Sequence, residues 1–199
     1  MPDRRLYVVN YHPLTFRLKR VRTERYEFTQ TGNTHEYDYL SGNVRQDLVY
    51  DYDLVGNILK QTNLAPDTGI DGTLDGTDKL VRMFRYDPLY RLLQATGRES
   101  TNQSSSYTWS VVNPISVNDN ALNCRAYTQR YEYDKNGRIT RMKHTAVGNN
   151  YTRKYNYDAN TNRLDSIDNG QSVPTVLSSF GYDNNGNQTT VLNGKIDLQ

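Results

Sequence analysis

The sequence predicts an all-β fold in which tandem β-hairpins stack into one continuous, twisted sheet. Along most of the 199 residues, two aromatic residues spaced two apart are followed by Asp, a turn and an aliphatic residue. Val, Ile, Leu and Phe together number only 42 of the 199 residues, or 21%, yet 17 Tyr supply apolar surface and the net charge is only +2. This composition favours an ordered array of hairpins that cover one another over a chain wrapped around a single core.

The clearest copy of the pattern lies at residues 130–141. Tyr131 and Tyr133 stand two apart, so an extended chain directs both side chains to the same face. Asp134 suits the first position of a type I turn, and Gly137 suits the left-handed position that ends a bulged three-residue hairpin. The segment therefore predicts two antiparallel strands joined by a tight turn.

That turn also predicts a register for the hairpin. Aromatic and aliphatic side chains then face one another across the strands and cover one face of each hairpin. The expected pairs are Asp134 with Arg138, Tyr133 with Ile139, and Tyr131 with Arg141.

Five further copies of the pattern are predicted along the chain. Their positions are Tyr37, Asp38, Gly42 and Val44; Tyr50, Tyr52, Asp53, Gly56 and Ile58; Phe84, Tyr86, Asp87, Pro88, Arg91 and Leu92; Tyr155, Tyr157, Asp158, Asn162 and Leu164; and Phe180, Tyr182, Asp183, Gly186 and Gln188. The copies at Tyr37 and Tyr157 require a loop that is one residue longer. The copy at Tyr182 is degenerate, because Gln188 stands where the aliphatic partner is expected.

Three stretches interrupt or precede the copies. Alternating residues from Leu6 to Phe28 predict short strands, broken at His12 and Pro13. Residues 62–79 form an Asp- and Gly-rich loop insertion, and residues 98–125 form a second insertion that includes a strand around Trp109. We expect residues 1–199 to form a single repeat segment that carries these two insertions.

The sequence offers little metal or catalytic chemistry. Asp67, Asp71, Asp75 and Asp78 could offer oxygen ligands to calcium, but their spacing differs from an EF-hand loop and favours a solvated insertion. Cys124 is the only cysteine, which excludes an internal disulfide and a cysteine metal site.

The residues that recur have a structural explanation. The histidines at 12, 35 and 144 have no metal-ligand spacing, and the Asp that begins each turn is suited to accept backbone hydrogen bonds. We therefore expect no catalytic, metal-binding or cofactor-binding residues in this chain.

The distribution of charge argues against nucleic-acid or membrane partners. Arg17, Lys19 and the arginines at 20, 22 and 25 form the densest basic stretch, but they alternate with Phe16 and Leu18 as on a half-exposed strand. No run of about 18 apolar residues is present to span a bilayer, and Met1–Arg5 is not followed by the apolar run of a signal peptide.

Several longer blocks resemble the RHS (YD-repeat) family. The blocks are HPLTFRLKRVRTER at 12–25, QDLVYDYDLVGNIL at 46–59, FRYDPLYRLLQATGRES at 84–100, QRYEYDKNGRI at 129–139 and NYTRKYNYDANTNRL at 150–164. They resemble the RHS portions of the B and C components of bacterial insecticidal toxin complexes, and the likeness spans about residues 11–190. The resemblance implies a spiralling sheet that forms part of a hollow shell.

The resemblance also implies a function. In those components the shell holds a toxic C-terminal polypeptide until a channel-forming component opens a way out. We therefore expect a non-catalytic wall segment, partnered by the remaining shell and its cargo and released from the cell as part of a larger toxin. The resemblance implies that the RHS-associated core, with the Asp pair that performs self-cleavage, follows this region in the family. The alternative is a YD-repeat cell-surface module for carbohydrate binding or adhesion, with exposed Tyr side chains stacking on sugars.

Overall fold

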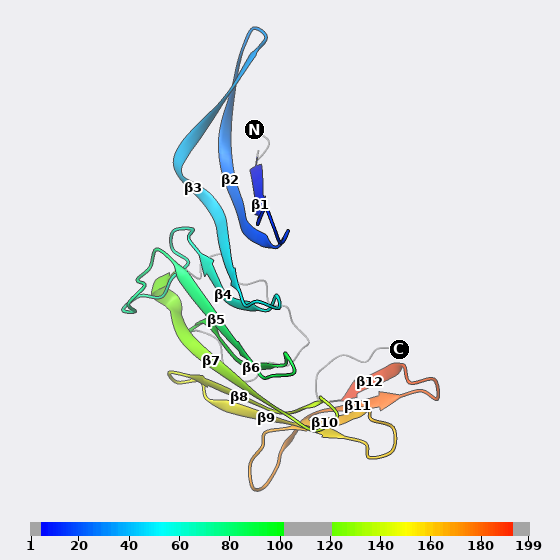
Figure 1. Ribbon diagram of the computed structural model, residues 1–199. Helices are drawn as coiled ribbons and strands as arrows, with labels where there is room; N and C mark the ends of the chain where they lie inside the picture. The colour runs from blue at the N-terminus through cyan, green and yellow to red at the C-terminus, as the bar shows by residue number, and fades with distance from the viewer. Residues whose placement is uncertain (1–4, 102–120, 193–199) are drawn as a thin grey trace. The chain divides into compact units, whose positions relative to one another are not determined.

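The protein is an antiparallel β structure with almost no helix (Figure 1). The computed structural model describes residues 5–101 and 121–192. Within them, each strand is hydrogen-bonded to its neighbour in sequence, so the strand order follows the chain. The elements are β1 (Arg5–Tyr11), β2 (Leu18–Thr31), β3 (Thr34–Tyr52), β4 (Ile58–Asn63), β5 (Leu80–Tyr86), β6 (Leu92–Ser100), the 3₁₀ turn η1 (Ala121–Asn123), β7 (Cys124–Tyr133), β8 (Ile139–Ala146), β9 (Tyr151–Tyr157), β10 (Leu164–Asp168), β11 (Val176–Tyr182) and β12 (Gln188–Leu192). The predicted all-β class is confirmed.

The described chain divides into two compact units. The first contains residues 5–85, 96–101 and 121–126, and the second contains residues 86–95 and 127–192. Each unit is built from consecutive antiparallel strand pairs. The prediction of a single repeat segment stays a prediction.

The turn between β7 and β8 has the predicted chemistry. The Asp134 N–H donates to the Arg138 carbonyl at 3.0 Å, and the Gly137 N–H donates back to the Asp134 carbonyl at 3.1 Å. Gly137 has a φ of 83°, which a residue with a Cβ adopts only at a cost. Tyr133 lies opposite Ile139, as predicted.

The next pair in this hairpin differs from the prediction. Tyr131 lies opposite Met142, and Arg141 lies opposite Glu132, because a β-bulge leaves Thr140 without a partner across the ladder. The predicted pairing of Tyr131 with Arg141 is therefore wrong. Because of the bulge, Ile139 and Met142, which are three residues apart, lie opposite Tyr133 and Tyr131, which are two residues apart.

The same bulge recurs directly after the turn in five hairpins whose register the structure describes. In each of them, the residue without a cross-strand partner directly follows the residue that lies opposite the tyrosine. The residues without a partner are Lys19, Leu59, Thr140, Asp165 and Thr189. A repeated bulge adds local twist at the same level of each hairpin. Tyr52 lies opposite Ile58, Tyr157 opposite Leu164, and Tyr182 opposite Gln188.

The predicted break at His12 and Pro13 is a further hairpin turn. The His12 N–H donates to the Arg17 carbonyl at 2.8 Å, and Tyr11 lies opposite Leu18. His12 therefore takes the place that Asp134 has in its hairpin. The sequence pattern missed this copy because it required Asp at that position.

The hairpin predicted at Tyr37, Asp38, Gly42 and Val44 is wrong. Strand β3 runs through these residues without a turn, and Tyr37 pairs with Phe28 of β2. The chain turns instead at 31–34, where the Gly32–Asn33 pair makes a two-residue loop and Gly32 has a φ of 64°. Glycine at the first central position is typical of such hairpins, and it overrides the Tyr–Asp signal further on.

The loop between β4 and β5 is held by main-chain contacts. The Gly69 N–H donates to the Thr77 carbonyl at 2.9 Å, and the Arg98 guanidinium donates to the carbonyls of Asp67 and Gly69, both at 3.1 Å. A Cβ on Gly69 would meet the Gly76 carbonyl at 2.0 Å, so this position requires glycine. Of the four aspartates considered as calcium ligands and set aside, Asp75 pairs with Lys79 at 3.1 Å.

Residues 102–120 of the second predicted insertion, including Trp109, lie outside the described residues. At its boundaries, the Thr101 N–H donates to the Asn123 carbonyl at 2.8 Å.

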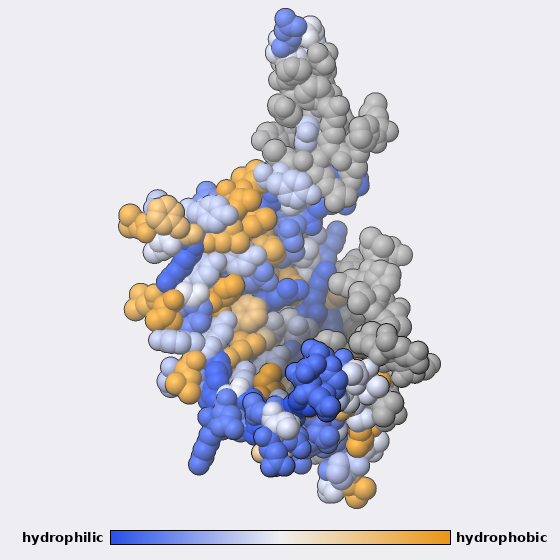
Figure 2. Space-filling model, turned by 90° about the vertical axis from the view of Figure 1, so that its right-hand side faces the viewer, coloured by the Kyte–Doolittle hydropathy of each residue, from blue (hydrophilic) through white to orange (hydrophobic). Residues whose placement is uncertain are grey.

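The core of the described residues is thin. Its buried apolar side chains are Ala65, Leu80, Ala95, Cys124, Met142, Ala146 and Ile167. Figure 2 shows apolar residues as separate patches among hydrophilic ones. Stability must therefore depend on contacts between strands as well as on burial.

We expect Tyr90→Gly to stabilise the protein and Gly137→Ala to destabilise it, each by about 1 kcal/mol. Tyr90 takes the turn position of Gly137 with a φ of 64°, where a side chain is strained. Gly137 has open space around its missing Cβ, so the backbone alone decides the effect of alanine there. Urea unfolding of both variants measures the difference, and a loss of stability in Tyr90→Gly would contradict this account of the turn.

Candidate functional site

The candidate functional site is the junction between one hairpin and the next. On one side of each junction, a turn is followed by an arginine and an aliphatic residue. On the other side, the first strand of the next hairpin ends with Tyr–Asp. The junctions are Arg17–Leu18 with Tyr52–Asp53, Arg91–Leu92 with Tyr133–Asp134, Arg138–Ile139 with Tyr157–Asp158, and Arg163–Leu164 with Tyr182–Asp183.

The tyrosine hydroxyl makes the same hydrogen bond at all four junctions. It donates to the main-chain carbonyl of the aliphatic residue in the preceding hairpin. The distances are 2.7 Å from Tyr52 to Leu18, 2.8 Å from Tyr133 to Leu92, 2.9 Å from Tyr157 to Ile139, and 2.8 Å from Tyr182 to Leu164. Burial raises the pKa of Tyr52, Tyr133 and Tyr157.

The arginine lies over the same tyrosine ring. The guanidinium carbon is 4.8 Å from the ring centroid for Arg91 over Tyr133 and 4.7 Å for Arg138 over Tyr157. The other two junctions have 5.8 Å for Arg17 over Tyr52 and 5.5 Å for Arg163 over Tyr182. These distances are within the range of a cation–π attraction, which adds to the hydroxyl contact.

The guanidinium then reaches the turn of the next hairpin. Arg91 donates to the Asp134 carbonyl and Arg163 to the Asp183 carbonyl, both at 3.2 Å. Arg17 donates to the carbonyls of Asp53 at 2.6 Å and Leu54 at 2.9 Å. At the third junction, Arg138 instead donates to the Asn162 side chain at 2.7 Å. Each arginine therefore links two turns.

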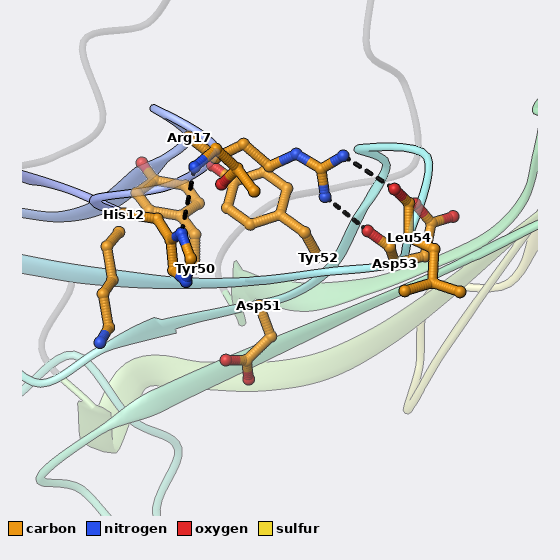
Figure 3. A pocket seen from close by; sticks show the side chains of 9 residues that line it. His12, Arg17, Tyr50, Asp51, Tyr52, Asp53 and Leu54 are labelled. Carbon is orange, nitrogen blue, oxygen red and sulfur yellow. Dashed lines mark hydrogen bonds between the residues drawn. The ribbon is translucent and has the colours of Figure 1, made fainter.

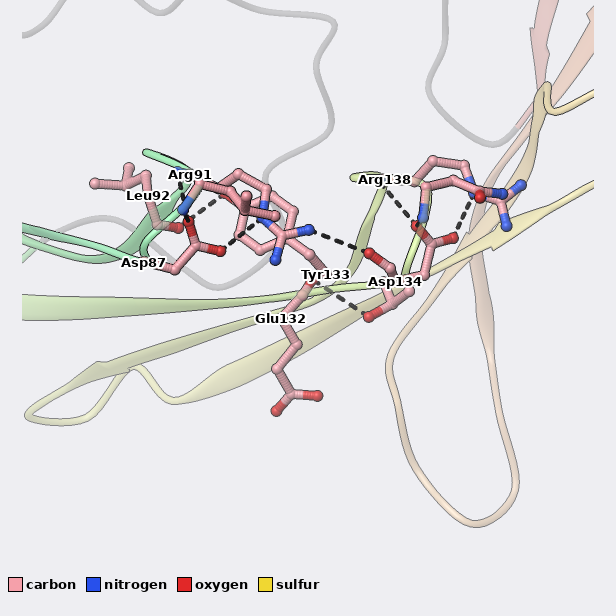
Figure 4. Close-up of polar contacts among 10 residues, drawn as sticks. Asp87, Arg91, Leu92, Glu132, Tyr133, Asp134 and Arg138 are labelled. Carbon is pink, nitrogen blue, oxygen red and sulfur yellow. Dashed lines mark hydrogen bonds and ion pairs between the residues drawn. The ribbon is translucent and has the colours of Figure 1, made fainter.

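At two of the turns, the first aspartate holds the arginine of its own hairpin. The Arg91 Nε donates to Asp87 Oδ2 at 2.6 Å, and the Arg138 Nε donates to Asp134 Oδ2 at 2.5 Å (Figure 4). The other carboxylate oxygen of Asp134 accepts the N–H groups of Asn136 and Arg138. Asp134 thus orients Arg138, which in turn contacts the following hairpin.

Hydrogen bonds also change the acidity of these carboxyls. Desolvation raises the pKa of Asp134, but hydrogen bonds from Arg138 and Asn136 together outweigh it and leave the pKa below its usual value. Asp53 and Asp87 follow the same balance, while for Asp158 and Asp183 the largest effect is a hydrogen bond from Thr161 or Asn187, which lowers the pKa directly.

A cavity of about 390 Å³ lies at the first junction (Figure 3). His12, Arg17, Lys19 and the tyrosines at 50 and 52 are among its lining residues. His12 Nδ1 accepts the N–H groups of Leu14 at 3.3 Å and Thr15 at 3.2 Å, as a turn aspartate would. The Tyr50 and Tyr52 rings are stacked with centroids 6.4 Å apart.

The structure places the other predicted repeat residues as follows. In four copies, the first aromatic residue lies opposite the second residue after the skipped one. The pairs are Tyr50 with Gln61, Tyr131 with Met142, Tyr155 with Ile167 and Phe180 with Val191. Gly56 and Gly186, like Gly137, have positive φ angles, of 112° and 89°. Burial raises the pKa of Tyr131 to about 12, and its hydroxyl donates to Gln129 at 2.7 Å. The pairing of Tyr86 with Leu92 stays a prediction, as does the packing role of Phe84.

Sequence reasoning missed the role of the arginines between hairpins. It placed Arg138 opposite Asp134 within one hairpin, and it did not anticipate contacts from Arg17 or Arg163 to the next turn. The signal in the sequence is an Arg–Leu or Arg–Ile pair directly after the turn. This pair is local, but its contacts are 18 to 43 residues away.

Two arginines of the basic stretch in β2 pair with buried carboxylates. The Arg20 guanidinium donates two hydrogen bonds, of 2.7 and 2.6 Å, to the Asp47 carboxylate in a bidentate ion pair. Arg22 pairs with Glu24 at 2.9 Å. The hydrogen bond with Asp47 raises the pKa of Arg20. The paired arginines support the prediction of a structural strand over a nucleic-acid ribbon.

Neither a metal site nor a helical membrane span is found in the described ranges. No group of three or more His, Cys, Asp or Glu side chains is arranged there to hold a metal ion. Likewise, no helix within residues 5–101 and 121–192 has the length and apolar composition needed to cross a membrane.

We expect Tyr133→Phe to lower the free energy of unfolding by about 1 to 2 kcal/mol, because it leaves the Leu92 carbonyl without its donor. Tyr90→Phe removes a hydroxyl from an exposed ring and is the matched control. Urea unfolding of both variants measures the effect, and equal losses would show that the junction hydroxyl adds nothing.

We expect the protein to lose stability as the pH falls below about 4, and Asp134→Asn to reduce that loss. The pKa of Asp134 is lower in the folded chain, so its contribution is present above the unfolded pKa and disappears as the folded carboxyl is protonated. Unfolding free energies between pH 6 and 3 test this, with the exposed Asp165→Asn as control. An unchanged pH dependence in Asp134→Asn would contradict the prediction.

Two curated toxin subunits are similar to the chain in sequence. It is 35% identical over 159 residues to toxin subunit YenC2 of Yersinia entomophaga, covering 77% of this chain and 15% of that subunit. It is 34% identical over 190 residues to toxin subunit YenC1 of the same organism, covering 90% of this chain and 18% of that subunit. The chain thus spans less than a fifth of the length of these relatives. No family model matches it.

Two crystal structures share the fold of the chain. They are the TcdB2-TccC3 and TcdB2-TccC3-Cdc42 structures, at 23% and 22% identity. Each has a TM-score of 0.62 and covers 94% of this chain and 9% of the matched chain. Together with the repeated Tyr–Asp hairpins and the sequence relatives, this likeness leads to one conclusion: in sequence and fold, the chain resembles the RHS (YD-repeat) region of toxin-complex subunits.

Proposed function

We propose that this chain is a structural segment of an RHS shell wall that encloses a toxic polypeptide, and that it performs no catalysis. The observation that carries the proposal is the junction, which recurs four times with the same tyrosine hydroxyl contact. Because each contact joins one hairpin to the next, further hairpins can be added in one direction without closing the sheet. A wall needs an element that can be extended in this way.

The thin core supports the same function. A wall that is one sheet thick has few positions that can be covered on both faces, and seven hydrophobic side chains are buried among those whose exposure the structure describes. The linked turns compensate by fixing strands to one another, as do the ion pairs that Arg20 and Arg22 of β2 make with the buried Asp47 of β3, at 2.6 and 3.8 Å. We infer that the wall is stabilised mainly by repeated contacts between strands.

The partners follow from the shell role. They are the remaining shell, the toxin cargo in the same or a partner polypeptide, and a channel-forming component that releases it. The cargo and its shell would act outside the producing cell as parts of one larger toxin.

The alternative function is a carbohydrate-binding or adhesion module, and the cavity beside Tyr50 is the feature that favours it. A sugar stacks on an open aromatic face. The four junction tyrosines each have an arginine over the ring and a bound hydroxyl, so they offer less of that surface. A glycan array with the isolated chain separates the two functions, because the wall segment is expected to bind no glycan.

The direct experiment replaces the matching 159 residues of YenC2 with the corresponding part of this chain. We expect the chimera to protect its C-terminal part from added protease as well as parental YenC2 does. A second chimera carrying Arg91→Ala and Tyr133→Ala breaks one junction and should lose that protection. A folded, strand-rich chimera whose C-terminal part is cut as fast as the same part expressed alone would overturn the wall proposal.

A further inference from the structure

Three turns among the described residues contain asparagine followed by glycine. The pairs are Asn136–Gly137, Asn169–Gly170 and Asn185–Gly186, and their glycines have φ angles of 83°, 64° and 89°. Asparagine is chemically labile, and most so before glycine, which has no side chain to keep its main-chain nitrogen away from the asparagine amide. Because the three pairs have the same local chemistry, any difference in their reactivity comes from the structure around them.

The reaction at such a pair is deamidation, and water is its only co-reactant. The main-chain nitrogen of glycine gives up its proton to the solvent and bonds to Cγ of the asparagine side chain. The amide nitrogen takes up a proton and leaves as ammonia. Water then opens the five-membered imide at either carbonyl, which gives aspartate or isoaspartate. In isoaspartate, the main chain runs through the former side chain and is one carbon longer.

The contacts of Asn169 oppose this reaction. Its side-chain oxygen accepts the N–H groups of Gln171 at 3.3 Å and Thr175 at 3.0 Å. The Gly170 N–H, which would have to attack, donates to the carboxylate of Asp168 at 2.7 Å, and Asp168 is buried. Both reacting groups are therefore held in place by the fold.

Asn136 and Asn185 have no such restraint on their side chains. Both are exposed, and no described residue makes a hydrogen bond with either side-chain amide. In each turn, the glycine N–H donates to the carbonyl of the turn aspartate, Asp134 or Asp183, at 3.1 Å. A local opening of the turn breaks this hydrogen bond and leaves the glycine nitrogen able to attack.

The two exposed turns differ in the residue that follows the glycine. Arg138 pairs with the aspartate of its own turn at 2.5 Å and donates to Asn162 of the next hairpin at 2.7 Å. In the other turn this position is Asn187, whose side-chain amide donates to the aspartate of its own turn at 2.9 Å. Among the described residues, that amide makes no hydrogen bond to another hairpin. The turn at Asn185 therefore has one contact fewer to oppose its opening.

We propose that Asn185 is a site of spontaneous deamidation, that Asn136 reacts more slowly, and that Asn169 is protected. Isoaspartate at position 185 lengthens the main chain directly before Gly186. The Gly186 N–H then no longer reaches the Asp183 carbonyl with its present geometry, so the modification loosens this turn. The proposal goes beyond the shell role and does not depend on it.

The experiment incubates the folded 199-residue chain at mildly alkaline pH and follows each asparagine by mass spectrometry of proteolytic fragments. Chromatography of the fragments separates aspartate from isoaspartate. We expect Asn185 to react about fivefold faster than Asn136, which is the factor expected for the loss of one hydrogen bond, and Asn169 to react more slowly than both. In urea, where the turns are unfolded, the three rates should agree.

Two substitutions test the residue after the glycine. Arg138→Asn gives Asn136 the surroundings of Asn185 and should raise its rate about fivefold, while Asn187→Arg should lower the rate at Asn185. Lys135→Asn is the matched control, because it introduces the residue that the other turn has at that position and should leave the rate at Asn136 unchanged. Circular dichroism confirms that each variant is folded.

Three results would overturn the proposal. The first is an equal rate at Asn185 and Asn169 in the folded chain. The second is an intact Asn185 in the folded chain over a period in which the urea-unfolded chain is deamidated. The third is an equal effect of Arg138→Asn and Lys135→Asn on the rate at Asn136, which would mean that the arginine does not control the opening of the turn.

Discussion

The structure depends on a tyrosine that reaches from one hairpin to the main chain of the hairpin before it. This contact joins neighbouring strand pairs in addition to the ladder hydrogen bonds between them. At Tyr133, three groups converge: the Leu92 carbonyl accepts the hydroxyl, Arg91 covers the ring, and the same arginine reaches the Asp134 carbonyl. A single layer of strands has little core, so a contact of this kind supplies the specificity that burial supplies in a globular domain.

The bulge and the turn make this contact possible. The turn brings Asp134 and Arg138 into contact, and the bulge at Thr140 then shifts the register of β8 against β7 by one residue. As a result, the two aromatic residues of each hairpin face positions that are three apart on the next strand, such as Leu164 and Ile167. Local geometry thus determines which side chains reach the neighbouring hairpin.

The sequence was sufficient where the physics is local. Turn chemistry at Asp134 and Gly137 predicted the pairing of Tyr133 with Ile139, because both depend on a few adjacent residues. The pairing of Tyr131 was predicted wrongly because a bulge shifts the register by one residue. In the sequence, the bulge is marked only by the three-residue spacing of the apolar side chains that face the aromatic residues. The Tyr37 copy failed because a Tyr–Asp pair does not turn the chain when a Gly–Asn loop has already done so nearby. The arginine contacts were missed because they join residues far apart in the sequence.

The central claim is that arginine and tyrosine stabilise the junction together and not as independent side chains. A double-mutant cycle with Arg91→Met and Tyr133→Leu, followed by urea unfolding, measures their coupling directly. The contacts described here predict a coupling free energy of about 1 to 2 kcal/mol. A coupling free energy near zero, with each single variant unfolding cooperatively, would contradict the account.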